Sequence, residues 1–178
     1  MYIGGQMNHF LSIILFFSFT SAIGQNVSKD SLAEKDPIAI AEFGGAFSRD
    51  LKGGGSGFGY DVAVEMTPIE HWLELELGVS PTFGAHSREW DVDLLFKKPW
   101  TFSPGVEFMF GVGLVWTHTE AYSLTTNALG GEMAMDFMFW PFAKHRFGWY
   151  LEPAYQYAFA RGHDQSIGVS AGLLVAIP

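Results

Sequence analysis

The segment Trp72-Leu-Glu-Leu-Glu-Leu-Gly-Val79 alternates apolar and polar residues from Leu73 onward. Successive side chains of a β-strand point to opposite faces, so Leu73 and Leu75 share one face while Glu74 and Glu76 share the other. A helix would scatter these residues around its axis. The segment therefore predicts a β-strand with one apolar face and one acidic face.

The same period of two recurs along the chain after residue 37, where no long stretch has the 3.6-residue period of a helix. Pro153 falls inside one of the alternating segments and has no N–H to donate, so a β-bulge is expected there. The alternation predicts eight strands, at residues 39–47, 58–66, 72–79, 90–97, 106–117, 129–139, 149–159 and 167–177.

The connections between these segments are of two kinds, and they alternate. Polar connections follow every odd-numbered strand, and segments rich in aromatic residues and Pro follow every even-numbered one. An even number of antiparallel strands with the two kinds of connection at opposite ends is what an up-and-down barrel requires. The polar connections are residues 49–57, 84–89, 118–128 and 161–165, and the aromatic ones are 67–72, 98–104 and 140–147.

The two faces of the strands differ in volume as well as in polarity. One face is built of Leu, Val, Phe, Tyr and Trp, whereas the other mixes Gly, Ala and Ser with single carboxylates. Small residues suit the crowded interior of a narrow barrel, and the bulky face then meets lipid. Tryptophans near the predicted strand ends are typical of interfacial girdles. These are Trp72, Trp90, Trp116, Trp140 and Trp149.

These observations predict an all-β fold, an eight-stranded antiparallel up-and-down transmembrane β-barrel. A soluble exported barrel of the lipocalin kind, with the rings in its core and an apolar ligand bound, is the alternative that remains open.

The composition excludes several classes of function. The 178 residues include no Cys, which rules out a disulfide framework, a Cys-ligated metal site and a thiol nucleophile. Only 16% of the residues are charged, and the formal net charge of −9 leaves no basic stripe with which to bind nucleic acid. The 21 Gly and the 16% aromatic content are consistent with the alternating pattern described above.

The N-terminal part of the chain has a different character. Residues 1–24 carry no charged side chain, and residues 10–23 are almost unbroken apolar sequence, too short to span a bilayer as a helix. This pattern predicts a signal peptide over residues 1–24. A polar tail follows at residues 25–36, and the outer-membrane barrel is expected over residues 37–178.

From residue 37 to residue 178 the chain resembles the small eight-stranded bacterial outer-membrane β-barrels of the OmpA, OmpX and OmpW kind. The resemblance rests on the signal, the strand count, the alternation of Gly with aromatic residues and the two kinds of connection. It implies a location in the cell outer membrane of a Gram-negative bacterium, with outer-membrane lipid and the outer-membrane assembly machinery as partners. Segments 94–100, 108–113 and 146–155 are similar to uncharacterised exported proteins, so the resemblance supplies no mechanism.

The face expected to line the lumen is strongly acidic, and Lys97 is almost the only cation that the strands set against it. Many like charges in a narrow tube repel one another, so something must compensate them. A buried hydrogen-bonded network, basic residues folded in from the ends, water, protonation and bound cations all remain open; cations would suit oxygen ligands. The expected lumen cluster is Glu42, Asp61, Glu65, Glu74, Glu76, Asp91, Asp93, Glu107, Glu132, Asp136 and Glu152.

Three histidines, His86, His118 and His163, fall in polar connections. Together with Glu120 or Asp164 they are candidates for a transition-metal site at the rim of the barrel. The expected alternative for loop histidines is simple solvation. We expect no cofactor.

A lipid hydrolase at the rim is a second alternative, because His118, Glu120 and Ser123 lie close together in the sequence. Their spacing matches no hydrolase motif, and a Gly-x-Ser-x-Gly elbow is missing from the sequence. We therefore expect a monomeric, non-enzymatic barrel with a structural, adhesive or minor-permeability role, whose acidic lumen attracts cations.

Overall fold

A computed structural model describes residues 37–142, 146–160 and 162–177. The expected signal peptide at residues 1–24 and the polar tail at residues 25–36 lie outside these described residues. No helix in the described part of the chain is long and apolar enough to cross a membrane.

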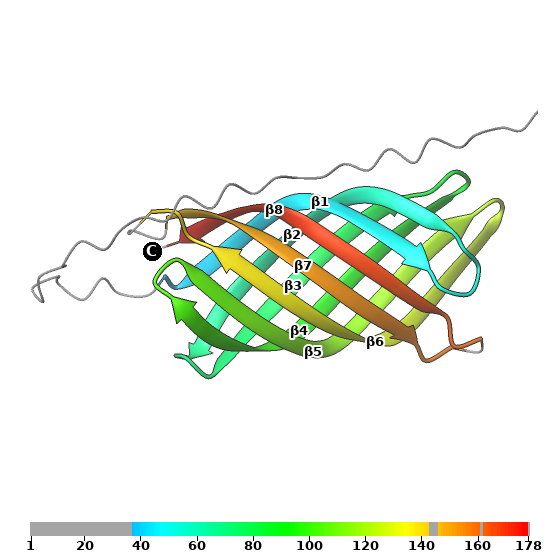
Figure 1. The fold of residues 1–178 in the computed structure, drawn as a ribbon. Helices are drawn as coiled ribbons and strands as arrows, with labels where there is room; N and C mark the ends of the chain where they lie inside the picture. Colours follow the sequence, from blue (N-terminus) through cyan, green and yellow to red (C-terminus); the bar gives the residue numbers. More distant parts are fainter. Residues whose placement is uncertain (1–36, 143–145, 161, 178) are drawn as a thin grey trace, which may run out of the picture. The chain divides into compact units, whose positions relative to one another are not determined.

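The described residues form eight antiparallel strands, each paired with its neighbours in chain order, and β8 pairs with β1 to close the barrel (Figure 1). The predicted fold class is thereby confirmed. The strands are β1 (Ala39–Asp50), β2 (Ser56–Ile69), β3 (Leu73–Phe83), β4 (Ser87–Ser103), β5 (Val106–Ala121), β6 (Leu124–Phe139), β7 (Phe147–Ala158) and β8 (Gln165–Ile177).

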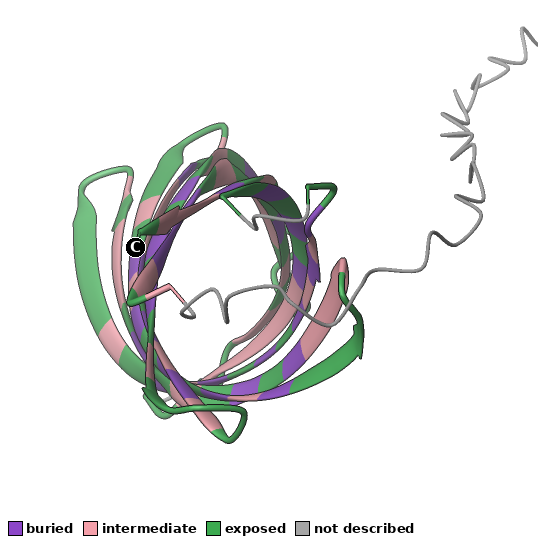
Figure 2. Ribbon diagram, turned by 90° about the vertical axis from the view of Figure 1, so that its left-hand side faces the viewer, coloured by how far each residue is buried: buried purple, intermediate pink, exposed green. Residues whose placement is uncertain are grey.

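Buried and exposed residues alternate along the strands, as the view along the barrel in Figure 2 makes visible. In β3, Glu74 and Glu76 are buried inside the barrel, whereas Leu77 is 56% exposed on its outside. The acidic face of the alternating pattern therefore lines the lumen, as predicted.

The outside of the barrel is apolar all the way round, because all eight strands expose large apolar side chains. Phe58 is 70% exposed and Leu173 65%. A soluble monomer rarely exposes an apolar patch larger than a few hundred Å², whereas lipid requires such a surface. This outer surface argues against the soluble exported barrel with its rings in the core.

Exposed tryptophans mark both ends of the apolar surface. Trp90 and Trp116 lie toward the end where β1 meets β2, and Trp72 and Trp149 lie at the opposite end. The expectation for Trp140 is wrong, because this side chain is only 7% exposed and packs inside the barrel against buried apolar residues. Its backbone N–H donates to the carbonyl of Gly105, which continues the β5–β6 ladder by one pair and keeps Trp140 on the inward face with Asp136 and Met138.

We call the end of the barrel with the β1–β2, β3–β4, β5–β6 and β7–β8 connections the loop end, and the opposite end the turn end. Three of the four polar connections at the loop end are shorter than predicted. Residues 118–128 are mostly strand, and the β5–β6 turn consists of Tyr122 and Ser123 alone. Beyond the lipid both faces of a strand can be polar, so apolar alternation stops while the hydrogen-bonded ladder continues.

The bulge expected at Pro153 is also wrong. Pro153 pairs with Val169 of β8 in unbroken register. On its other side, the ladder with β6 lacks the two pairs between Ala134–Ala154 and Phe137–Leu151, yet the register is the same before and after this gap. The missing N–H of the proline thus interrupts the β6–β7 ladder locally without an inserted residue.

Candidate functional site

The centre of the lumen is occupied by Lys97, which projects inward from β4 and is 1% exposed. Its ammonium lies 2.6 Å from Oε2 of Glu152, 3.1 Å from Oε1 of Glu65 and 3.4 Å from Oδ2 of Asp136, and it also donates to Oε2 of Glu76. These carboxylates come from β2, β3, β6 and β7. One cation thus ties four strands together across the barrel.

Small residues on neighbouring strands make room for these long side chains. Gly111 of β5 pairs directly with Lys97, and a Cβ at this glycine would lie 2.7 Å from Cγ of the lysine. Gly78 of β3 stands in the same relation to Asp93, with a Cβ 2.5 Å from the carboxylate. The glycines of the inner face are therefore needed where the ionic side chains cross the lumen.

The structure buries ten of the eleven carboxylates expected in the lumen, and only Glu107 is half-buried. Lys97 is the one basic side chain buried among the described residues. Lys97 reaches this position from within β4 and not from either end of the barrel. Lys98, the next residue, lies on the outer face and donates to the carbonyl of His71, 2.6 Å away.

The lumen on the turn side of Lys97 is filled by an apolar layer. Met109, Met138 and Leu174 are fully buried, and they pack with Ile40, Tyr150 and Trp140 in one cluster. Since packed apolar side chains leave no space for water, this layer closes the lumen at the turn end.

On the loop side of Lys97 the lumen holds carboxylates and open space. A cavity of about 60 Å³ is lined by Asp61, Asp91, Asp93 and Glu132, among others. Asp61 accepts hydrogen bonds from the hydroxyls of Tyr150 (2.5 Å) and Ser80 (2.6 Å). Other members accept similar bonds from Thr117 and Gln156.

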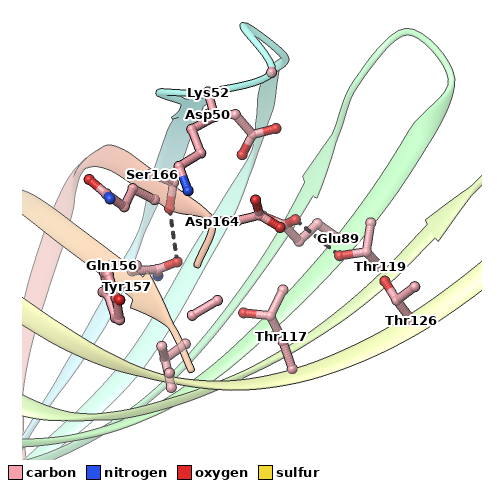
Figure 3. Close-up of a pocket in the computed structure, with 16 residues that line it drawn as sticks. Asp50, Lys52, Glu89, Thr117, Thr119, Thr126, Gln156, Tyr157, Asp164 and Ser166 are labelled. Atoms are coloured by element: carbon pink, nitrogen blue, oxygen red, sulfur yellow. Dashed lines mark hydrogen bonds between the residues drawn. The ribbon is translucent and has the colours of Figure 1, made fainter. Parts of the chain in front are cut away.

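Above it lies a larger cavity of about 370 Å³, which we call the vestibule (Figure 3). Gln156 lines both cavities, so they adjoin. Threonine and serine hydroxyls line the vestibule together with three carboxylates, those of Asp50, Glu89 and Asp164.

Asp50 is the last residue of β1 and lies in the loop-end rim, beyond the apolar surface. Burial raises the pKa of Asp50 above its ordinary value, and repulsion by Asp164 raises it further. The only basic side chain that lines the described vestibule is Lys52, whose ammonium donates to the carbonyls of Gly162 (2.6 Å) and His163 (2.8 Å). The vestibule therefore favours cations over anions.

The structure does not bring the three candidate histidines together. His86 stacks on Tyr122, His118 stacks on Trp116, and His163 stacks on Tyr157. Among the described residues, the side chains placed closely enough to hold a metal ion are instead four carboxylates of the lumen, Glu42, Glu65, Glu76 and Asp136.

The hydrolase candidates are only partly assembled. His118 and Glu120 lie on the outer face of β5 with 3.6 Å between Nε2 and Oε1, and Nδ1 of His118 is 2.9 Å from the Asn127 amide oxygen. Ser123 lies in the β5–β6 turn, and none of the hydrogen bonds in the described residues joins it to His118. Nucleophilic catalysis requires that contact between hydroxyl and base.

Tyr150 and Gln156 contribute to the lumen, but the sequence pattern did not single them out. Tyr150 lies two residues before Glu152 in β7, and Gln156 lies four residues after it. All three therefore share the inner face, so strand parity alone could have found Tyr150 and Gln156. Lys52 lies in a connection, and no sequence signal predicts which carbonyls it binds.

The comparisons with known proteins support the fold. No protein-family model and no curated protein matches the sequence. Neisserial surface protein A shares 12% identity with a TM-score of 0.64, over 78% of this chain and 96% of its own. Ail of Yersinia pestis, solved with the heparin analogue sucrose octasulfate, shares 11% identity with a TM-score of 0.56, over 79% of this chain and 99% of its own. The outer-membrane enzyme PagL shares 11% identity with a TM-score of 0.50, over 78% of this chain and 99% of its own. The chain thus has the fold of small bacterial outer-membrane barrels, which supports the expected location in the outer membrane.

Proposed function

We propose that the chain is an integral outer-membrane protein whose lumen is a blind acidic well. The well takes up cations at the loop end and does not conduct them across the membrane. The observation that carries the proposal is the central position of Lys97, held by four carboxylates directly beside the apolar layer of Met109, Met138 and Leu174.

The loop-side half of the lumen supports cation uptake. A cation that enters the vestibule meets Asp50, Glu89 and Asp164, and the deeper cavity adds Asp91 and Asp93. A narrow cleft lined by one sign of charge raises the local concentration of the opposite ion. The carboxylates also set this chain apart from a polyanion binder, since sulfate groups such as those of the ligand named for Ail would be repelled here.

The turn-side half supports the absence of through-conduction. An ion that leaves water for a layer of packed Met and Leu side chains loses its hydration and gains no partner. A minor-permeability role would need a water path through this layer. A binding role is also favoured over hydrolysis, because no hydrogen bond in the described part of the chain joins Ser123 to His118, whose Nδ1 lies beside Asn127 instead.

Planar-bilayer recordings of the full chain test whether the well is blind. Wild-type protein is expected to give no stepwise ion current in KCl at either polarity. Heat-modifiable mobility in gels, measured on the same sample, verifies that the barrel is folded. Cation-selective current steps from folded wild-type protein would overturn the blind well.

Paramagnetic Mn²⁺ tests uptake at the loop end. In NMR spectra of the full chain in detergent micelles, Mn²⁺ is expected to broaden amide signals of the loop-end rim before those of the turn end. The double substitution Asp50→Asn with Asp164→Asn should weaken this broadening, whereas Glu70→Gln, in the turn between β2 and β3, should leave it unchanged. Equal broadening in wild type and the double variant would overturn the proposed uptake.

A further inference from the structure

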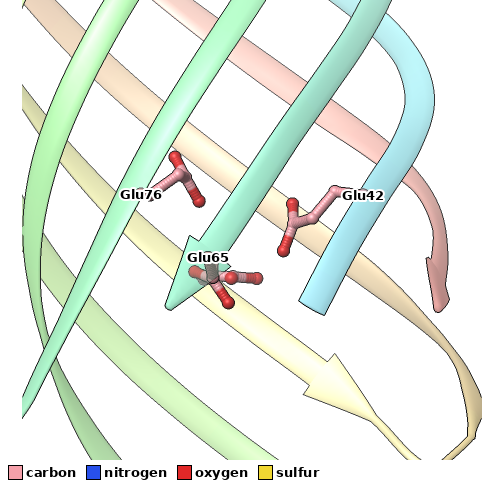
Figure 4. Close-up of side chains that lie close together, drawn as sticks. Glu42, Glu65 and Glu76 are labelled. Carbon is pink, nitrogen blue, oxygen red and sulfur yellow. The ribbon is translucent and has the colours of Figure 1, made fainter. Parts of the chain in front are cut away.

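Four buried carboxylates converge beside Lys97 from four different strands. One oxygen each of Glu42 (β1), Glu65 (β2), Glu76 (β3) and Asp136 (β6) lie within 4.8 Å of one another. Figure 4 shows the first three directed toward a common centre. All four side chains are at most 3% exposed.

Lys97 does not satisfy this group. An ammonium has three donors and one positive charge, and here it already faces the carboxylates of four residues. Oε1 of Glu42, Oε2 of Glu65 and Oδ1 of Asp136 are buried without any hydrogen-bond partner. Buried polar atoms are nearly always paired, so these unpaired oxygens, on three of the four converging carboxylates, point to a further cation beside them.

We infer that the lumen binds a hard divalent cation, with Ca²⁺ as the best fit, between Glu42, Glu65, Glu76 and Asp136. Ca²⁺ takes oxygen ligands at about 2.3–2.6 Å, so two ligands on opposite sides of the ion lie about 4.6–5.2 Å apart. The four oxygens all lie within 4.8 Å of one another, so one ion of this size can contact every one of them. The group contains no nitrogen or sulfur ligand, which disfavours softer transition metals.

The ion and the ammonium of Lys97 would bind different oxygens of these carboxylates. The ammonium contacts one oxygen each of Glu65, Glu76, Asp136 and Glu152, while the ion would bind the unpaired oxygens of Glu42, Glu65 and Asp136 together with an oxygen of Glu76. Together they set three positive charges against the five carboxylates of Glu42, Glu65, Glu76, Asp136 and Glu152. The ion would thus act as a structural part of the barrel, sealed between strands.

This inference rests on the proposed barrel but not on cation uptake in the vestibule, which lies at the loop end. The Mn²⁺ and conductance experiments above test the well, whereas retention of a buried ion tests the site. A barrel that takes up Mn²⁺ at its rim yet retains no ion after refolding would sustain the first proposal and overturn this one.

The test is metal retention by the full chain. Protein unfolded in urea with EDTA is refolded into detergent with Ca²⁺, with Mg²⁺ or without a divalent ion, desalted, and analysed by elemental mass spectrometry. Wild-type protein is expected to retain about one Ca²⁺ per chain, as one site of this kind predicts. Bound Ca²⁺ should also raise the urea midpoint, because it binds only the folded state.

Two variants, one at a proposed ligand and one outside the site, test whether the retained ion occupies this site. Glu42→Gln removes a ligand that no hydrogen bond or ion pair in the described residues joins to Lys97, and should lower Ca²⁺ retention at least about tenfold, because Ca²⁺ affinity depends on the number of charged ligands. Glu70→Gln changes an exposed carboxylate in the turn between β2 and β3, outside the lumen, and should leave retention unchanged. If wild type retains no divalent ion, or if Glu42→Gln retains as much as wild type, the site is overturned. If Glu42→Gln does not refold, the site is judged from the amount of Ca²⁺ that wild-type protein retains.

Discussion

On the turn side of Lys97 the lumen is packed with Met109, Met138 and Leu174, whereas on the loop side the same strands enclose carboxylates, hydroxyls and about 370 Å³ of open space. Both halves use the inward positions of the strands, so the difference lies in which side chains occupy them. The turn side resembles the core of a soluble protein, and the loop side resembles a binding cleft. One barrel can therefore combine a closed half with an open, polar half, because the two occupy different lengths of its axis.

The largest expected effect follows from removal of the cation at the boundary between the halves. Lys97→Met leaves four buried carboxylates without their shared partner, and breaking a buried ion pair from one side costs about 3–5 kcal/mol. Urea unfolding of the full chain in detergent should report this loss. Lys98→Met, on the outer face, should cost much less, and equal losses for the two variants would mean that Lys97 is not the tie between the halves.

A smaller effect is expected from the apolar layer on the turn side. Leu174→Ala opens a cavity in that layer and should cost about 2–5 kcal/mol in the free energy of unfolding. Leu173→Ala is the matched control, because Leu173 is 65% exposed on the lipid face whereas Leu174 is fully buried. Lipid can fill the space left at Leu173, so its loss should be clearly smaller. A larger loss for Leu173→Ala would contradict the closed layer.

The smallest effect concerns the pH dependence of the loop side. Since burial and Asp164 raise the pKa of Asp50, the folded chain holds that proton more tightly than the unfolded chain does. Stability should therefore fall as pH rises from the ordinary aspartate value through the raised one. Asp50→Asn removes this contribution, so urea midpoints measured across that window should decline less steeply. Identical pH profiles would contradict the repulsion between Asp50 and Asp164.

The alternation of residues along the strands predicts most of the fold. The alternation at residues 72–79 and its repeats placed the apolar side chains outside and the carboxylates inside, because a strand leaves each residue only two directions. The same rule assigns eleven carboxylates to the inner face, and ten of them are buried in the structure. Parity fails where apolar alternation stops, which is why β5 and β6 extend beyond their predicted ends at the loop side.

Trp140 illustrates a second limit. Its position after a predicted strand suggested an interfacial ring. The ladder between β5 and β6 continues beyond Phe139 through the hydrogen bond from Trp140 to Gly105, so the ring lies on the same inward face as Asp136 and Met138. Where a ladder ends depends on the partner strand, so the alternating pattern alone did not show that parity still applies at residue 140.

The sequence by itself determined that this chain forms eight strands with a lipid-facing surface and an acidic interior, since both follow from the identity of every second residue. Only the tertiary structure decided how the acidic interior is arranged. The strands cross the barrel at a tilt, so residues from β2, β3, β6 and β7 meet at Lys97 according to register and not according to sequence distance. That register divides the lumen into a closed half and an open half.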